Sequence, residues 1–292
     1  MRHFLLTVVL MCATTLGGCD GGVLDPKGPI TFGERQIMFN ATGIMLAIVI
    51  PVMLATLGVA FWFRASNERA RYRPNFRYSG RIEMLVWSIP LMTVLLVGTV
   101  AWIGAYDLDP PKPITSSVKP LKIQAVSLDW KWLFIYPEQG IASVNQLTIP
   151  VGTPVSFELT SSGVMNSFFV PQLAGQIYTM VGMVTYLNLR ADVPGTYRGM
   201  SANFSGDGFA DMHFNAQAVS REDFARWVAS AKSTGPVLDT TAYADLVKPS
   251  TAVAPFTYRS ITAGLFAGIM SVGLQPGEGL CVPYPEYMRA AR

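Results

Sequence analysis

The stretch GTYRGMSANFSGDGFADMH, residues 195–213, gathers side chains that could do chemistry in a Gly-rich loop. They are the hydroxyls of Ser201 and Ser205, the amide of Asn203, the thioether of Met212 and the imidazole of His213. A copper electron-transfer centre needs thiolate and imidazole ligands together. The chain has 2 histidines and 3 cysteines, and no cysteine lies in this loop. The inventory therefore predicts a loop without metal, in which His213 is an ordinary strand residue and Met212 packs in the core.

The composition is that of a membrane-associated chain. Hydrophobic residues make up 50% of it and charged residues only 14%, against about a quarter in soluble proteins. The formal net charge is +3, but positive charge is concentrated between residues 64 and 81, where Glu68 is the one acid among six arginines. A basic run with aromatic neighbours can indicate nucleic-acid binding. Its place between two apolar spans favours a cytoplasmic loop that follows the positive-inside rule.

The first 18 residues predict a signal peptide, with a short basic start, an apolar run and a small-residue exit. The exit Leu16-Gly17-Gly18-Cys19 is similar to a bacterial lipobox, which predicts lipidation of Cys19. Ordinary cleavage nearby, with Cys19 unmodified, is the alternative. Residues 19–40 would then form an outer, periplasmic segment. Cys281 is interpreted as a lone thiol without a role, and no disulfide framework is indicated.

Two uncharged or nearly uncharged stretches are long enough to cross a membrane as helices. They are residues 41–63 and 84–105, each longer than the roughly 20 residues that a bilayer requires. Pro51 and Pro90 inside them are tolerable in membrane helices. The arginine-rich loop, residues 64–83, then places both termini outside. A Pro-rich linker, residues 106–120, follows the second span and marks a domain boundary.

The rest of the chain predicts an all-β domain followed by short helices. Short apolar runs separated by Pro and Gly turns extend over residues 121–219, which favours a β-sandwich. Ser220, with Asp223 three places later, predicts a capped helix over 220–232 whose apolar face carries Phe224, Trp227 and Val228. Helices are also expected over 240–247 and 261–273, the latter too short to span a bilayer. The segment after Gln275 gives no usable signal, so 220–292 is assigned as a helical segment and tail.

Three segments, in this order, resemble subunit II of the haem-copper oxidases. They are LDWKWLFIYP at 128–137, VMNSFFVP at 164–171 and the loop at 195–213. The resemblance implies a cupredoxin-like domain. It also implies that five copper-ligand positions are lost and that Met212 alone is retained. The lost positions are Asn166, Ser201, Asn203, Ser205 and Phe209.

The stretches at 25–28, 136–140 and 164–171 are similar to the branch of quinol oxidases of the cytochrome bo type. Membership in that branch implies that this chain holds no cofactor, and that the haems, the copper and the quinol site belong to subunit I. The implied partners are subunits I, III and IV and membrane lipid, with ubiquinol as the substrate of the complex. The implied location is the bacterial inner membrane, with the β domain in the periplasm. The implied role is to support assembly and cover subunit I of a proton-translocating oxidase.

Three residues have alternative interpretations. Glu83 stands at the cytoplasmic end of the second span, directly before residue 84, and the matching glutamate in the family lies at the mouth of a proton channel of subunit I. A solvated carboxylate at a positive helix start is the alternative. Trp130 and Trp132 lie where copper-bearing relatives pass electrons, but packing is the better interpretation without copper.

For the whole chain, the rival hypothesis is a free-standing, membrane-anchored periplasmic binding lipoprotein.

Overall fold

The structure is a computed structural model that describes residues 22–71 and 75–272. It divides into two units, a helical one from Gly33 to Leu108 and a mainly β one that joins residues up to Phe32 to those from Asp109 onward. The expected signal peptide, the lipidation site Cys19, Cys281 and the tail after Gln275 lie outside the described residues, so those expectations stay predictions.

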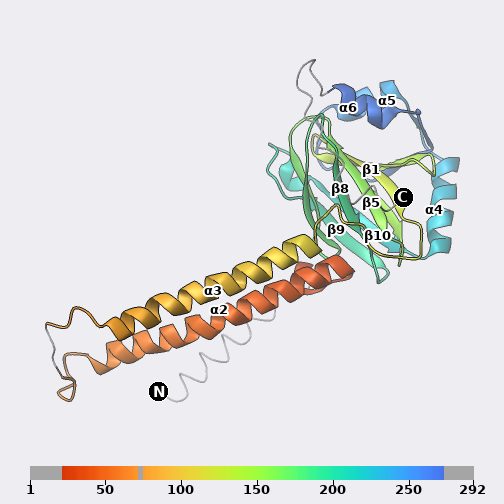
Figure 1. Ribbon diagram of the computed structural model, residues 1–292. Coiled ribbons are helices and arrows are strands. Elements are labelled where there is room, and N and C mark those ends of the chain that lie inside the picture. Colours follow the sequence, from red (N-terminus) through yellow and green to blue (C-terminus); the bar gives the residue numbers. More distant parts are fainter. Residues whose placement is uncertain (1–21, 72–74, 273–292) are drawn as a thin grey trace, which may run out of the picture. The chain divides into compact units, whose positions relative to one another are not determined.

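Two long helices make up the first unit (Figure 1). Helix α2 covers Pro29–Trp62 and helix α3 covers Gly80–Asp107, and both are long and apolar enough to cross a membrane. Both extend beyond the expected spans, and α2 begins twelve residues earlier because Pro29 is a favourable first helical residue. The helices approach closely at Gly104, where a Cβ atom would collide with the side chain of Ile37. Most of their large apolar side chains are exposed, as expected of helices that face lipid or partner helices.

The second unit is a sandwich of two sheets. The six-stranded sheet has the order β12-β3-β2-β1-β5-β8, in which β12 covers Phe256–Tyr258, and the five-stranded sheet has the order β4-β10-β9-β6-β7. Within these two sheets, pairs β1–β5 and β4–β10 are parallel and the other pairs are antiparallel. The strands of the domain are β1 (Leu121–Leu128), β2 (Lys131–Tyr136), β3 (Ile141–Val144), β4 (Gln146–Pro150), β5 (Val155–Ser161), β6 (Asn166–Val170), β7 (Ala174–Thr179), β8 (Thr185–Leu189), β9 (Gly195–Ser201) and β10 (His213–Val219).

Aromatic side chains fill the space between the sheets. Trp132 of β2 packs edge-on against Phe168 of β6, with ring centroids 5.3 Å apart, and against Phe214 of β10 at 5.8 Å. Phe134 and Phe157 complete the same cluster from β2 and β5. All of these side chains are fully buried or nearly so. This packing agrees with the interpretation of Trp132 as a core residue.

The segment after the sandwich packs back onto it. Helix α4 (Arg221–Ser233) is capped by Ser220, whose hydroxyl accepts a hydrogen bond from the Asp223 backbone N–H at 3.0 Å. Its apolar face, with Phe224, Trp227 and Val228, packs on the sandwich core. Helix α5 (Thr240–Val247) has the predicted bounds, and α6 (Leu265–Val272) lies within the predicted range. Three short strands, β11 (Val237–Leu238), β12 (Phe256–Tyr258) and β13 (Ser260–Ile261), are additions to the expected helical segment.

These C-terminal elements create a second apolar cluster on the outer face of the six-stranded sheet. Strand β12 pairs with β3, and α5 and α6 supply Leu246, Phe266 and Ile269 to a cluster that includes Leu133 and Ile135 of β2. Strand β2 is therefore buried on both faces, which explains its apolar run from Trp132 to Tyr136.

The N-terminal segment is fastened to the sandwich. After η1 (Gly22–Leu24), the backbone of Lys27 donates to Gln172 O at 2.8 Å and accepts from Asp192 N at 2.8 Å. Gly28 follows, and a Cβ atom at this position would collide with the carbonyl oxygen of Arg190. Residues 25–28 therefore act as a strap over the β domain, for which Gly28 is sterically required.

Candidate functional site

The candidate site lies at one end of the five-stranded sheet, where β6 begins and β9 ends. Asn166 and Ser201 are side by side there and are almost fully buried. The Ser201 hydroxyl donates a hydrogen bond to Asn166 Oδ1 at 2.9 Å, and Asn166 Nδ2 donates to Val164 O at 3.0 Å. Two positions that are 35 residues apart in sequence are thus joined by a direct, buried polar contact.

The other predicted positions make separate local contacts. Asn203 Nδ2 donates to Met165 O at 3.1 Å and so ties the loop to the start of β6. The Ser205 hydroxyl lies 4.0 Å from the sulfur of the buried Met212, a weak contact at most. Phe209 opens the short helix η2 (Phe209–Asp211) and packs edge-on against Phe204, whose side chain is 74% exposed. His213, the first residue of β10, is exposed.

Trp130 packs against the loop that follows β9 and holds it in place. It occupies the two-residue turn between β1 and β2 with a φ of 64°, in the left-handed region that side chains other than glycine seldom adopt. Its indole Nε1 donates to Ser205 O at 3.0 Å. Gly208 lies against the ring, since a Cβ atom there would collide with Trp130 and would lie 2.6 Å from Thr251 Cγ2. Trp130 is therefore a packing residue that holds the loop, the role expected for it from the sequence.

Lys131, next to Trp130, is a buried cation that the sequence analysis does not identify. Its side chain is only 1% exposed, and Nζ donates to Lys248 O at 2.8 Å, Ser250 Oγ at 2.6 Å and Asp129 O at 3.2 Å. Burial lowers the pKa of Lys131, and the nearby Asp129 charge opposes that shift. A lysine within an otherwise apolar strand was the available signal. Lys131 thus links the turn that carries Trp130 to the C-terminal segment at Lys248 and Ser250.

The donors at this site do not match a copper centre. Hydroxyls, amides and one thioether replace the thiolates and imidazoles that such a centre requires. Within residues 22–71 and 75–272, no three His, Cys, Asp or Glu side chains gather in a way that could hold a metal ion. Asn166 and Ser201 instead satisfy each other by hydrogen bonding, which a buried polar pair requires.

Glu83 lies in the other unit, in the first turn of α3. Its Oε2 accepts a hydrogen bond from Trp87 Nε1 at 3.2 Å, one helical turn further on. Its backbone N–H donates to Ser79 O at 2.9 Å. The side chains of Glu83 and Trp87 are both exposed in the chain alone. The indole of Trp87 thus orients one carboxylate oxygen of Glu83.

Comparison with known proteins places these features in a family. A family model described as COX Aromatic Rich Motif matches residues 232–271, the segment that Lys131 binds and that covers β2. Subunit 2 of the cytochrome bo(3) ubiquinol oxidase of Pseudomonas aeruginosa is 49% identical over 95% of this chain and 84% of its own length. The ubiquinol oxidase subunit 2 of Acetobacter aceti is 45% identical over 90% of this chain and 86% of its own.

Among solved structures, the periplasmic domain of subunit II of the cytochrome oxidase of Bradyrhizobium japonicum is similar, with 24% identity and a TM-score of 0.38 over 41% of this chain and 98% of that one. The identity and coverage of the curated relatives decide the assignment. The chain belongs to the family of ubiquinol oxidase subunit 2, of the cytochrome bo(3) type.

Proposed function

We propose that this chain is the subunit of a quinol:oxygen oxidoreductase that binds no cofactor itself. In this proposal the haems, the copper and the ubiquinol site belong to subunit I, and the complex translocates protons across the bacterial inner membrane. The chain would support assembly, with its two helices in the membrane and its β domain covering the periplasmic face of subunit I. Subunits III and IV and membrane lipid would be the remaining partners.

The observation that carries this proposal is the closed hydrogen-bonded pair of Ser201 and Asn166. A subunit that accepts electrons from a soluble protein donor needs a redox centre near its surface. Here the positions that resemble copper-ligand positions carry hydroxyl and amide groups, which form hydrogen bonds with each other and with backbone carbonyls. Relatives named ubiquinol oxidase subunit 2 provide independent support for quinol as the electron donor of the complex.

Glu83 is proposed as the point at which this subunit delivers protons to subunit I. Its position in the first turn of an apolar helix and its hydrogen bond from Trp87 support this role, because an oriented carboxylate at a membrane edge can exchange protons with water.

Purification of the assembly through a tag on this chain tests the proposal. We expect a large haem-bearing subunit to co-purify, oxygen uptake with ubiquinol and not with cytochrome c, and copper at the stoichiometry of subunit I alone. An additional copper ion that is bound to this chain in the purified assembly would contradict the proposal. Recovery of the chain without any haem protein would favour the free-standing binding lipoprotein instead.

A further inference from the structure

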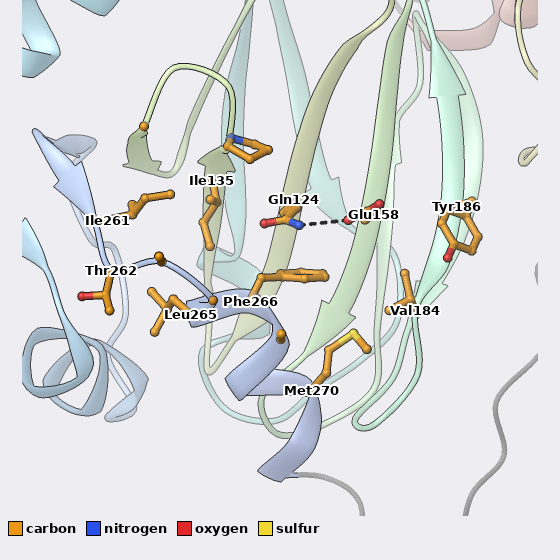
Figure 2. Close-up of a pocket in the computed structure, with 15 residues that line it drawn as sticks. Gln124, Ile135, Glu158, Val184, Tyr186, Ile261, Thr262, Leu265, Phe266 and Met270 are labelled. Carbon is orange, nitrogen blue, oxygen red and sulfur yellow. Dashed lines mark hydrogen bonds between the residues drawn. The ribbon is translucent and has the colours of Figure 1, made fainter. Parts of the chain in front are cut away.

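A pocket of about 660 Å³ lies on the outer face of the six-stranded sheet, between the sheet and helix α6 (Figure 2). None of its lining residues lies in the loop of Ser201, which follows a strand of the other sheet. Its volume falls in the range of small-molecule sites, about 300–1,000 Å³. Its wall is formed mainly by Gln124 of β1, Ile135 of β2, Glu158 of β5, Tyr186 of β8, and Phe266 and Met270 of α6.

The sheet side of the pocket presents a hydrogen-bonded polar pair. Gln124 and Glu158 are neighbours across the parallel strands β1 and β5, and Gln124 Nε2 donates to Glu158 Oε2 at 2.9 Å. One N–H of the amide is therefore used to orient the carboxylate. The oxygens that remain, Glu158 Oε1 and Gln124 Oε1, can only accept hydrogen bonds while Glu158 is ionised.

The carboxylate has no cationic partner in the described part of the chain. No ion pair of Glu158 occurs among residues 22–71 and 75–272, and Lys122, two residues before Gln124 on the same strand, forms none with it. A half-buried carboxylate in a pocket gains most from a ligand that supplies both positive charge and N–H donors.

The α6 side of the pocket is apolar. Phe266 extends from α6 toward the sheet, and Met270 lies one turn further along beside Val184 (Figure 2). The aromatic ring and the thioether can surround a short alkyl or aryl body, and an aromatic face also attracts an ammonium group. The pocket thus combines one acceptor pair with an apolar enclosure.

We propose that this pocket binds a small amphipathic primary amine, with its ammonium group on Glu158 and Gln124 and its apolar body between Phe266 and Met270. Neutral molecules of the same shape lack the positive charge that the carboxylate favours, and an anion would be repelled by it. The binding function is independent of the assembly and proton-delivery roles proposed above, because none of its residues lies in the loop of Ser201 or at Glu83.

Photolabelling of the purified oxidase complex tests this site. The probe is an alkyl amine that carries a diazirine on its chain, and hexylammonium is the competitor. We expect labelled peptides that contain Val184 or Met270, and loss of that label when hexylammonium is added. Hexanoate at the same concentration is expected not to compete, because it presents an anion to Glu158.

Glu158→Gln is the decisive variant. It keeps the shape of the side chain and an oxygen that can accept from Gln124, so the fold is preserved, but it removes the charge. We expect at least about tenfold less labelling, as the loss of one charge-assisted hydrogen bond implies. Glu222→Gln is the matched control, because Glu222 lies in the first turn of α4, which contributes no residue to the lining of the pocket. Equal labelling of wild type and Glu158→Gln, absence of label from this pocket, or competition by hexanoate equal to that by hexylammonium would each overturn the proposal.

Discussion

The Ser201 hydroxyl donates a hydrogen bond to the side-chain oxygen of Asn166 at 2.9 Å, between the end of β9 and the start of β6. Both residues are almost fully buried. If one of the two side chains is removed, the other therefore cannot form a hydrogen bond to bulk water instead. The contact therefore has two consequences. It holds the end of β9 against the start of β6. It also makes the effect on stability of a substitution at one position depend on the residue at the other.

Ser201→Ala should lower the free energy of unfolding of the full-length chain by about 1–3 kcal/mol, because Asn166 Oδ1 is left without its buried donor. The double variant with Asn166→Ala should cost less than the sum of the single variants, by about 1 kcal/mol. Denaturant unfolding measures all three. Ser233→Ala, on the exposed end of α4, is the control and should change stability little. Strict additivity of the two single changes would contradict the predicted coupling.

Gly208→Ala should destabilise the loop at Trp130. The added methyl group would collide with the indole ring and lie 2.6 Å from Thr251 Cγ2, and overpacking of this kind typically costs about 1–3 kcal/mol. Thermal unfolding should report the change, and so should the tryptophan fluorescence of the chain, to which Trp130 contributes. Gly268→Ala in α6, where nothing lies within 4 Å of the added atom, should be neutral or stabilising. Equal effects of the two substitutions would show that the packing at Gly208 is unimportant.

Glu83→Ala should reduce the oxygen-uptake rate of the purified complex with ubiquinol and change its dependence on pH, since the proposed proton donor is removed. The copper and haem content should stay at the wild-type level. Glu68→Ala removes an acid from the arginine-rich loop instead, and serves as the control for a general change in local charge. A rate equal to that of wild type at every pH would reject the role of Glu83.

Tyr243→Phe should make the domain less sensitive to alkaline pH. Burial raises the pKa of Tyr243 from its ordinary value of 10.0 to about 12. Above pH 10 the unfolded chain loses this proton before the folded chain does, so the contribution of Tyr243 to stability falls between pH 10 and about 12. The slope of unfolding free energy against pH should be shallower in the variant over that interval. An unchanged slope would show that Tyr243 does not titrate differently in the two states. Burial also raises the pKa values of Tyr136, Tyr197 and Tyr258, so part of the slope should remain.

The sequence by itself determined the features that depend on local composition and period. The two apolar spans, the arginine-rich loop between them and the capped helix after Ser220 follow from neighbouring residues alone. The scarcity of thiolate and imidazole ligands is likewise a matter of counting. These predictions concern what the chain contains, and they hold in any tertiary arrangement.

Only the tertiary structure decided the features that depend on distant segments. Strands β3, β7 and β12 are short or lack a clear alternation of apolar and polar residues, and β12 is a strand because it pairs with β3. The turn at Trp130 interrupts an otherwise continuous β-like run, and its left-handed backbone is held by contacts with Ser205 and Gly208. Lys131 is buried because Lys248 and Ser250 supply acceptors more than a hundred residues away. Such contacts arise from long-range packing. A local pattern can draw attention to a lysine beside an apolar run, but it does not show which distant segments the lysine contacts.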